Sequence, residues 1–257
     1  MEALLRGKLE PAELVEQVRH TDMRAVVDRA WQGFKERMDG ESEQVRKALL
    51  FGAVAHFSER LRLSPEQEPV ALDVTRVHSA ANHLYSTSGY SIWFAPVGFD
   101  YPLQLFRRQA NRLCNGTTVT VTPHSPVLVD GACTVAALCT GEASQRLVFS
   151  LNLPIPGSDI EVFDRQTLAR IAWFPADMQV SRFLLLLDAL RRIGDPNLAR
   201  VARELLYHHH PAVRWQAFEV LMECSPEQCE QYREILGSLP DSGLDAMLSD
   251  YLQRGGV

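Results

Sequence analysis

Residues 117–139, TTVTVTPHSPVLVDGACTVAALC, decide which fold the sequence predicts. The stretch contains three short runs, at 117–122, 127–130 and 134–139, in which the side-chain pattern has a period of two. Turn-forming residues separate these runs, first Pro123 to Pro126 and then Asp130 with Gly131. Short runs with this period between turn residues are typical of antiparallel strands. We therefore expect consecutive strands in this part of the chain.

The same pattern extends from about Ser64 to about Ala176. Six further runs are candidate strands, at 70–76, 90–95, 103–106, 146–152, 160–163 and 169–173. No helical pattern comes between them. Many short strands without an intervening helix predict an antiparallel sandwich or barrel.

Helical patterns flank this region on both sides. Residues 21–40 carry apolar side chains with a period of 3.6, begin at Thr21 or Asp22 as a cap, and end at Gly40. A second helix is expected over 42–63. The predicted fold class is therefore α+β, with an N-terminal helical segment (1–65), an antiparallel β-sandwich or barrel (66–176) and a helical tail (177–257).

The helical tail contains an internal repeat. Prolines stand at positions 196, 211, 226 and 240, so successive prolines are 14 or 15 residues apart. Proline is tolerated where a helix begins, because the first helical N–H has no partner within the helix. The spacing predicts short helices joined by tight turns, paired into hairpins of about 30 residues as in an α-solenoid.

The stretch HHHPAVRWQAFEVL (208–221) resembles the turn and second helix of HEAT-like repeats. In those repeats an aspartate precedes a valine, an arginine and an alanine, and His210, Val213, Arg214 and Ala217 occupy these positions here. Residues 195–205 form a looser copy. The resemblance places His208, His209 and His210 in a turn. Consecutive residues there point in different directions, so we expect a structural role for them and no metal site.

The stretch NGTTVTVTPHSPVLVDGACTVAALCTG (115–141) resembles the second half of a cupin-type jelly roll. The resemblance covers residues 70–175 and implies that a metal-dependent member would hold its ion through histidines. The sequence departs from that pattern. Four residues lie between His78 and His83, where the pattern has one. Leu128 occupies the position of the later histidine, and His124 lies in the turn. We therefore expect the barrel to hold no metal and no cofactor.

Aromatic and arginine side chains in the middle region suggest where a small molecule would bind. Ligands of β-barrels usually lie inside the barrel against inward-facing residues. An arginine also suits a carboxylate, although residues 106–112 are expected to form an exposed loop. The candidate ligand-binding residues are His83, Tyr85, Trp93, Phe94, Phe106, Arg107 and His124. Most of the aromatic side chains have an alternative role as core residues.

Composition limits the class of protein. Acidic residues outnumber basic ones, 32 to 26, which argues against binding to a nucleic-acid backbone. No apolar run approaches the ~20 residues that a membrane span needs. The N-terminus has no signal-peptide pattern and the five cysteines have no paired spacing, so we expect a cytoplasmic protein with free thiols.

Three functions follow from these observations. The first is a non-catalytic binding or regulatory protein, in which the helical tail contacts a partner protein or a second copy of the chain. The second is a divergent metal-dependent cupin enzyme, a dioxygenase, isomerase or lyase, using a divalent ion such as iron or zinc. The third is a sensor whose barrel binds a small ligand. No catalytic residue is identified, and we favour the first.

Overall fold

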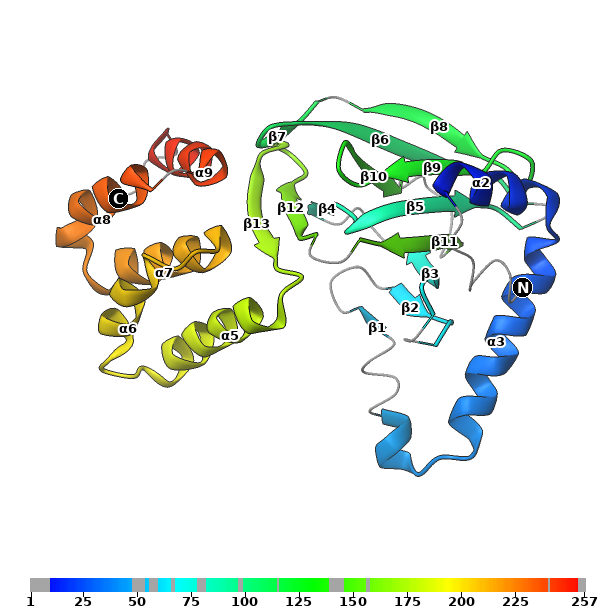
Figure 1. Ribbon diagram of the computed structural model, residues 1–257, viewed down its shortest axis with the longest axis horizontal. Helices are drawn as coiled ribbons and strands as arrows, with labels where there is room; N and C mark the ends of the chain where they lie inside the picture. Colours follow the sequence, from blue (N-terminus) through cyan, green and yellow to red (C-terminus); the bar gives the residue numbers. More distant parts are fainter. Residues whose placement is uncertain are drawn as a thin grey trace. The chain divides into compact units, whose positions relative to one another are not determined.

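The structure consists of two compact units. The computed structural model describes residues 10–47, 54–55, 60–65, 68–77, 82–96, 99–114, 116–138, 146–155, 158–239 and 241–253. Unit 1 comprises Met1–Arg108 and Cys114–Pro156, and unit 2 comprises Gln109–Leu113 and Gly157–Val257 (Figure 1). The three-part division expected from the sequence stays a prediction.

Unit 1 begins with two helices, α2 (Pro11–His20) and α3 (Met23–Asp39). The side chain of Asp22 caps α3, accepting hydrogen bonds from the backbone N–H groups of Arg24 and Ala25, each at 3.1 Å. This cap satisfies donors that have no partner within the helix. Gly40 follows the last turn. The helix predicted over 21–40 is confirmed.

The helix predicted over 42–63 is wrong in its second half. Residues 43–47 are helical, but β1 (Val54–Ala55) and β2 (Arg60–Arg62) are strands. In β2 the alternation of Arg60, Leu61 and Arg62 has a period of two, and Leu61 packs against the core below the helices. Pairing of β2 with the strand at 71–77 determines the conformation of residues 60–62. A search for helical periodicity along the sequence cannot detect such a pairing.

Apart from β4 (His83–Tyr85), the strands of unit 1 form two antiparallel sheets. Besides β1 and β2, these strands are β3 (Ala71–Val77), β5 (Gly89–Phe94), β6 (Tyr101–Gln109), β8 (Thr117–Val121), β9 (Val127–Asp130), β10 (Thr134–Leu138) and β11 (Arg146–Pro154). One sheet has the order β1-β2-β3-β11-β5-β9. In the other, β6 lies between β10 and β8. Each of the predicted runs contains a strand, so the antiparallel β prediction is confirmed.

The closed barrel is wrong for the described strands, which lie in separate sheets. Hydrogen bonds from β5 go to β9 and β11, whereas those from β6 go to β8 and β10. The sheets pack face to face through apolar side chains instead. Trp93, Ala95, Val129 and Val148 from the first sheet meet Tyr101, Leu103 and Val121 from the second. The two sheets are thus held together by side-chain packing between their facing surfaces, as in a β-sandwich, and not by hydrogen bonds that close a barrel.

The opposite face of the six-stranded sheet is covered by the N-terminal helices. Leu14 and Val18 of α2, together with Met23, Val26 and Phe34 of α3, pack against it. From the sheet come Leu72, Val74, Ile92, Phe94 and Leu151. Trp93 of β5 and Val148 of β11 point the other way, toward the second sheet, so both faces of the six-stranded sheet are covered.

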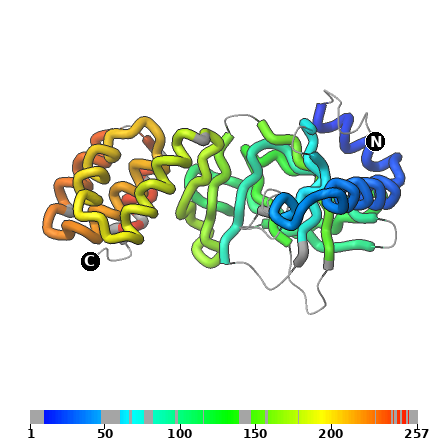
Figure 2. The backbone as a smooth tube through the Cα atoms, turned by 90° about the horizontal axis from the view of Figure 1, so that it is seen from below, coloured from blue at the N-terminus to red at the C-terminus, as the bar shows by residue number. Residues whose placement is uncertain are grey.

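Unit 2 combines a β-hairpin with a series of helices (Figure 2). The strands β12 (Ile160–Asp164) and β13 (Arg170–Phe174) pair antiparallel. The helices are α5 (Met178–Ile193), α6 (Leu198–Leu205), α7 (Pro211–Cys224), α8 (Cys229–Ser238) and α9 (Ser242–Gln253), with a 3-10 turn η1 (Pro226–Gln228). They share one core with Trp173, to which every one of these α-helices contributes. No described helix is long and apolar enough to cross a lipid bilayer.

Among the described residues, the proline spacing predicted the start of one α-helix of unit 2 correctly and the starts of two others to within two or three residues. Pro211 is the first residue of α7, Pro226 begins η1, and Pro196 lies in the turn before α6. Pro240 lies outside the described residues. The missing N–H of proline costs nothing at a first helical position, which explains the agreement.

A buried arginine holds the hairpin of unit 2 together. The guanidinium of Arg170 lies 4.5 Å from the centre of the Trp173 ring and donates to Glu161 at 2.9 Å. Its other terminal nitrogen donates to Asn111, and the backbone N–H of Arg170 donates to the carbonyl of Asn111 at 2.8 Å. These contacts satisfy the buried charge within unit 2.

A substitution at Gly131 can test how closely the backbone segments of unit 1 approach each other at this turn. A Cβ atom added there would lie 2.2 Å from the carbonyl oxygen of Thr87. We expect Gly131→Ala to lower the free energy of unfolding by about 1–3 kcal/mol, measured by urea denaturation, because backbone must move to make room. Gly40→Ala is the control, since no heavy atom lies within 4 Å of its added Cβ. Equal stability of the two variants would contradict the close approach at Gly131.

Candidate functional site

A row of polar side chains crosses the six-stranded sheet of unit 1 on the face opposite the helices. Strand register aligns Arg62 with Asp73, Asp73 with Ser150, and Ser150 with Trp93. These residues share one face because neighbours in register across a sheet point to the same side. We call them, with the side chains flanking them on that face, the polar row. The flanking members are Arg60, Thr75, Ser91 and Asn152.

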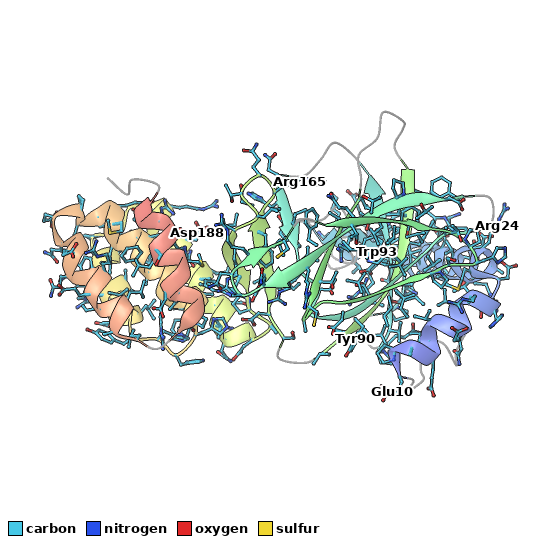
Figure 3. The ribbon with its side chains drawn as sticks, turned by 90° about the horizontal axis from the view of Figure 1, so that it is seen from above. Glu10, Arg24, Tyr90, Trp93, Arg165 and Asp188 are labelled. Atoms are coloured by element: carbon cyan, nitrogen blue, oxygen red, sulfur yellow. The ribbon has the colours of Figure 1, made fainter. Side chains whose placement is uncertain are left out.

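Most of the polar row is buried. Asp73, Thr75, Ser91, Ser150 and Trp93 each expose less than a tenth of their surface. Figure 3 shows Trp93 among the strands of unit 1. Arg62, at the other end, leaves 39% of its side chain exposed. The row therefore runs from the surface into the interior.

Asn152 organises the hydrogen bonds of the polar row. Its amide nitrogen donates to Oδ2 of Asp73 at 2.8 Å and to the hydroxyl of Ser150 at 3.1 Å. Its amide oxygen accepts from the hydroxyl of Ser91 at 2.5 Å. Both ends of the amide are therefore used, which fixes its orientation.

Two arginines surround the carboxylate of Asp73. Nε of Arg62 lies 3.6 Å from Oδ1 of Asp73, an ion pair longer than a hydrogen bond. Burial raises the pKa of Asp73, and the charges of Arg62 and Arg60 and the Asn152 hydrogen bond act in the opposite direction. Burial likewise lowers the pKa of Arg60, against the attraction of Asp73. An arginine nevertheless keeps its proton in proteins.

Several buried polar atoms of the polar row lack a hydrogen-bond partner in the described structure. They are Nε of Arg60, Oγ1 of Thr75, Nε1 of Trp93 and Oδ1 of Asp73. The guanidinium of Arg60 lies 5.9 Å from the centre of the Trp93 ring. Buried polar groups are normally satisfied, so a concentration of unsatisfied ones on a single face is unusual.

The structure distributes the sequence-predicted ligand residues over several places. Trp93 and Phe94 point to opposite faces of β5, and they belong to the sheet–sheet core and the helix–sheet core respectively. Phe106 is buried on β6 opposite Val135. Arg107 is exposed on the same strand. The loop predicted over 106–112 is wrong except for the turn at 110–111, because Arg112 begins the short strand β7 (Arg112–Leu113). Among these candidates, Trp93 is the one that belongs to the polar row.

The remaining candidates lie near the ends of strands. His83 is exposed and Tyr85 is partly buried on β4, and burial raises the pKa of the Tyr85 phenol. His124 is exposed in the turn between β8 and β9. His78 lies outside the described residues. In the part of the chain that is described, no three His, Cys, Asp or Glu side chains gather in a way that could hold a metal ion.

The histidine run of unit 2 caps a helix. Nδ1 of His210 accepts a hydrogen bond from the backbone N–H of Ala212 at 3.2 Å, in the first turn of α7. Its Nε2 lies 2.9 Å from a carboxylate oxygen of Asp159. His208 accepts the backbone N–H of His210 through Nδ1 at 3.1 Å, and its ring lies 4.9 Å from that of Phe183. The turn predicted at His208–His210 is confirmed.

A second feature of unit 2 is the outward side of α5. Leu187 and Val180 are buried, and Leu184 and Leu190 pack against the core of the unit. Four large apolar side chains of the helix are exposed instead: Phe183 by 37%, Leu185 by 69%, Leu186 by 48% and Ile193 by 73%. We call these residues the α5 face.

Sequence reasoning missed most of the polar row. Asp73, Thr75, Ser91, Ser150 and Asn152 occupy alternate positions of predicted strands, where a polar residue ordinarily faces water. One feature of the sequence could have revealed them. Polar residues recur at alternate positions of three predicted strands whose other positions are mostly apolar. Recognising it required the strand order, because Ser91 and Asn152 are 61 residues apart.

Comparison with known proteins adds no family to this description. A scan against models of protein families gives no match. A search of curated proteins gives no significant similarity.

The histidine run predicts a pH dependence of stability. Burial, followed by the charges of His209 and His210, lowers the pKa of His208 from 6.5. The unfolded chain therefore binds a proton at a pH where the folded chain does not, and stability falls as the pH decreases through the unfolded pKa. We expect thermal melts at about pH 7.5 and about pH 5.5 to show a smaller acid-induced loss for His208→Asn than for the wild type.

An asparagine at this position can still accept the His210 N–H through its side-chain oxygen. His20→Asn is the matched control, because the His20 side chain is 78% exposed. An acid-induced loss in His208→Asn as large as in the wild type would contradict the assignment.

Proposed function

We propose that the protein is a non-catalytic binding or regulatory protein that acts through its helical unit, and that a second copy of the chain covers the α5 face. The α5 face carries this proposal, because large contiguous apolar patches on a protein surface mark interaction sites. Leu185 and Ile193 each expose more than two thirds of their surface. Covering such side chains contributes about 1.5–3 kcal/mol each.

The spacing along α5 favours a second copy as the occupant. Arg182, Leu186, Ala189 and Ile193 are all exposed, and they are separated by four, three and four residues. This is the spacing of a seam between two helices. In an antiparallel pair related by a two-fold axis, Leu186 of each copy would lie against Ala189 of the other. The interface then contains the same Leu186–Ala189 contact twice, once in each direction, as two-fold symmetry requires.

The resemblances raised by the sequence are part of the proposal. Two antiparallel sheets packed face to face support a cupin-like jelly-roll origin for unit 1. Short helices joined by tight turns, with His210 capping α7, support HEAT-like repeats in unit 2. HEAT-like repeats bind other proteins through exposed helix surfaces, which agrees with the binding role.

Self-association through the α5 face can be measured by sedimentation velocity over a range of protein concentrations. We expect the wild-type chain to dimerise and Leu186→Glu to weaken the dimer by at least about 100-fold, because two leucines are lost per interface. Leu147→Glu in unit 1 is the matched control, since Leu147 is also exposed, by 51%. It should dimerise like the wild type.

Two results would overturn the assignment. A wild-type chain that stays monomeric at every concentration would exclude the second copy as occupant. A Leu186→Glu variant that dimerises as tightly as the wild type would place the interface elsewhere.

A further inference from the structure

The unsatisfied atoms of the polar row are mostly donors. Nε of Arg60 and Nε1 of Trp93 carry hydrogen and can only donate, and the hydroxyl of Thr75 can donate as well. Each is buried without a partner in the described structure. Leaving such a group unsatisfied costs about 1–3 kcal/mol. A ligand that brings oxygen acceptors to this face would remove that cost.

The three donors lie near one another. Arg60 is the register partner of Thr75 across β2 and β3. Its guanidinium reaches across the sheet to lie 5.9 Å from the centre of the Trp93 ring. The side chain of Arg60 therefore brings the β2 donor to the β5 donor, above the strands that lie between them.

The charges on this face do not balance. Among the side chains described on these strands, the face carries two guanidinium groups, Arg60 and Arg62, and one carboxylate, Asp73. Arg62 pairs with Asp73, and no hydrogen bond or ion pair within the described residues engages Arg60. Asp73 attracts both arginines, so this face carries one positive charge more than it has negative charges. A single added negative charge would balance it.

We propose that the polar row binds the carboxylate of a small organic acid, with Arg60, Thr75 and Trp93 as donors to its oxygens. One carboxylate supplies both the missing charge and the missing acceptors, and guanidinium groups match its planar geometry. The half-exposed Arg62 marks the end of the row from which the acid enters. The proposal does not depend on association through the α5 face.

The fourth unsatisfied atom of the polar row, Oδ1 of Asp73, indicates which kind of organic acid fits. Oδ1 of Asp73 is an acceptor, and the approach of Arg62 at 3.6 Å leaves it without a hydrogen bond. A hydroxyl on the acid would donate to it. An ammonium group would also do so, but it would restore the excess positive charge. A small hydroxy acid therefore fits the row better than a simple carboxylic acid or an amino acid.

The indole N–H of Trp93 provides a direct readout in the full-length chain. We would follow its ¹H–¹⁵N NMR signal, assigned through Trp93→Phe, while adding sodium lactate, sodium propionate, inorganic phosphate or sodium chloride at matched ionic strength. The expected result is a saturable shift with lactate, a weaker one with propionate, and none with chloride. Tighter binding of phosphate than of lactate would overturn the carboxylate assignment, as would a chloride response equal to that of lactate.

Thr75→Val tests the site without disturbing the sheet, because valine has the shape of threonine. We expect lactate affinity to fall about tenfold or more, since a hydrogen bond to a charged group is lost. The melting temperature of the ligand-free variant should equal or exceed that of the wild type, because an unsatisfied buried hydroxyl is removed. Thr118→Val, at an exposed position of β8, is the control and should bind lactate normally.

Three outcomes would contradict the proposal. One is the absence of any saturable shift of the Trp93 signal with lactate or propionate. Another is a Thr75→Val variant that binds lactate like the wild type. The third is a lower melting temperature of ligand-free Thr75→Val, which would show that the hydroxyl has a structural partner.

Discussion

The division of the six-stranded sheet into an apolar face and a polar row is the constraint on which unit 1 depends. Leu72, Ile92 and Leu151 point toward α2 and α3, and the alternation of side chains then directs Asp73, Ser91 and Ser150 to the other side. A shift of one residue in any of these strands would bring polar side chains under the helices, and a shift of β3 would bury the charge of Asp73 there. Packing of the helices therefore fixes the place of the polar side chains.

The strands were predictable because each carries its own local pattern. Every run predicted between positions 70 and 173 contains a strand, and Asp22, Gly40 and Pro211 mark helix ends as expected. The predictions fail where pairing between segments distant in the sequence determines the structure. Arg60 to Arg62 resembled a helix surface until β3 supplied a partner, and no local pattern distinguishes a closed barrel from two packed sheets.

The candidate site was less predictable than the fold for the same reason. Trp93 attracted attention as an aromatic residue, but its partners come from β2, β3 and β11, and their order in the sheet is not the order in the chain. In unit 2 the histidine run was assigned correctly to a turn, because Pro211 follows it directly. The capping role of His210 and its contact with Asp159 required the structure.

The most direct test of the polar row is a double-mutant cycle between Asp73 and Asn152, measured by urea denaturation of Asp73→Ala, Asn152→Ala and the double variant. Their side chains are joined by a hydrogen bond of 2.8 Å across the register of β3 and β11. We expect a coupling free energy of about 1–3 kcal/mol, as for buried contacts within one network. Losses of stability that simply add, within about 0.3 kcal/mol, would contradict the register from which the polar row is built.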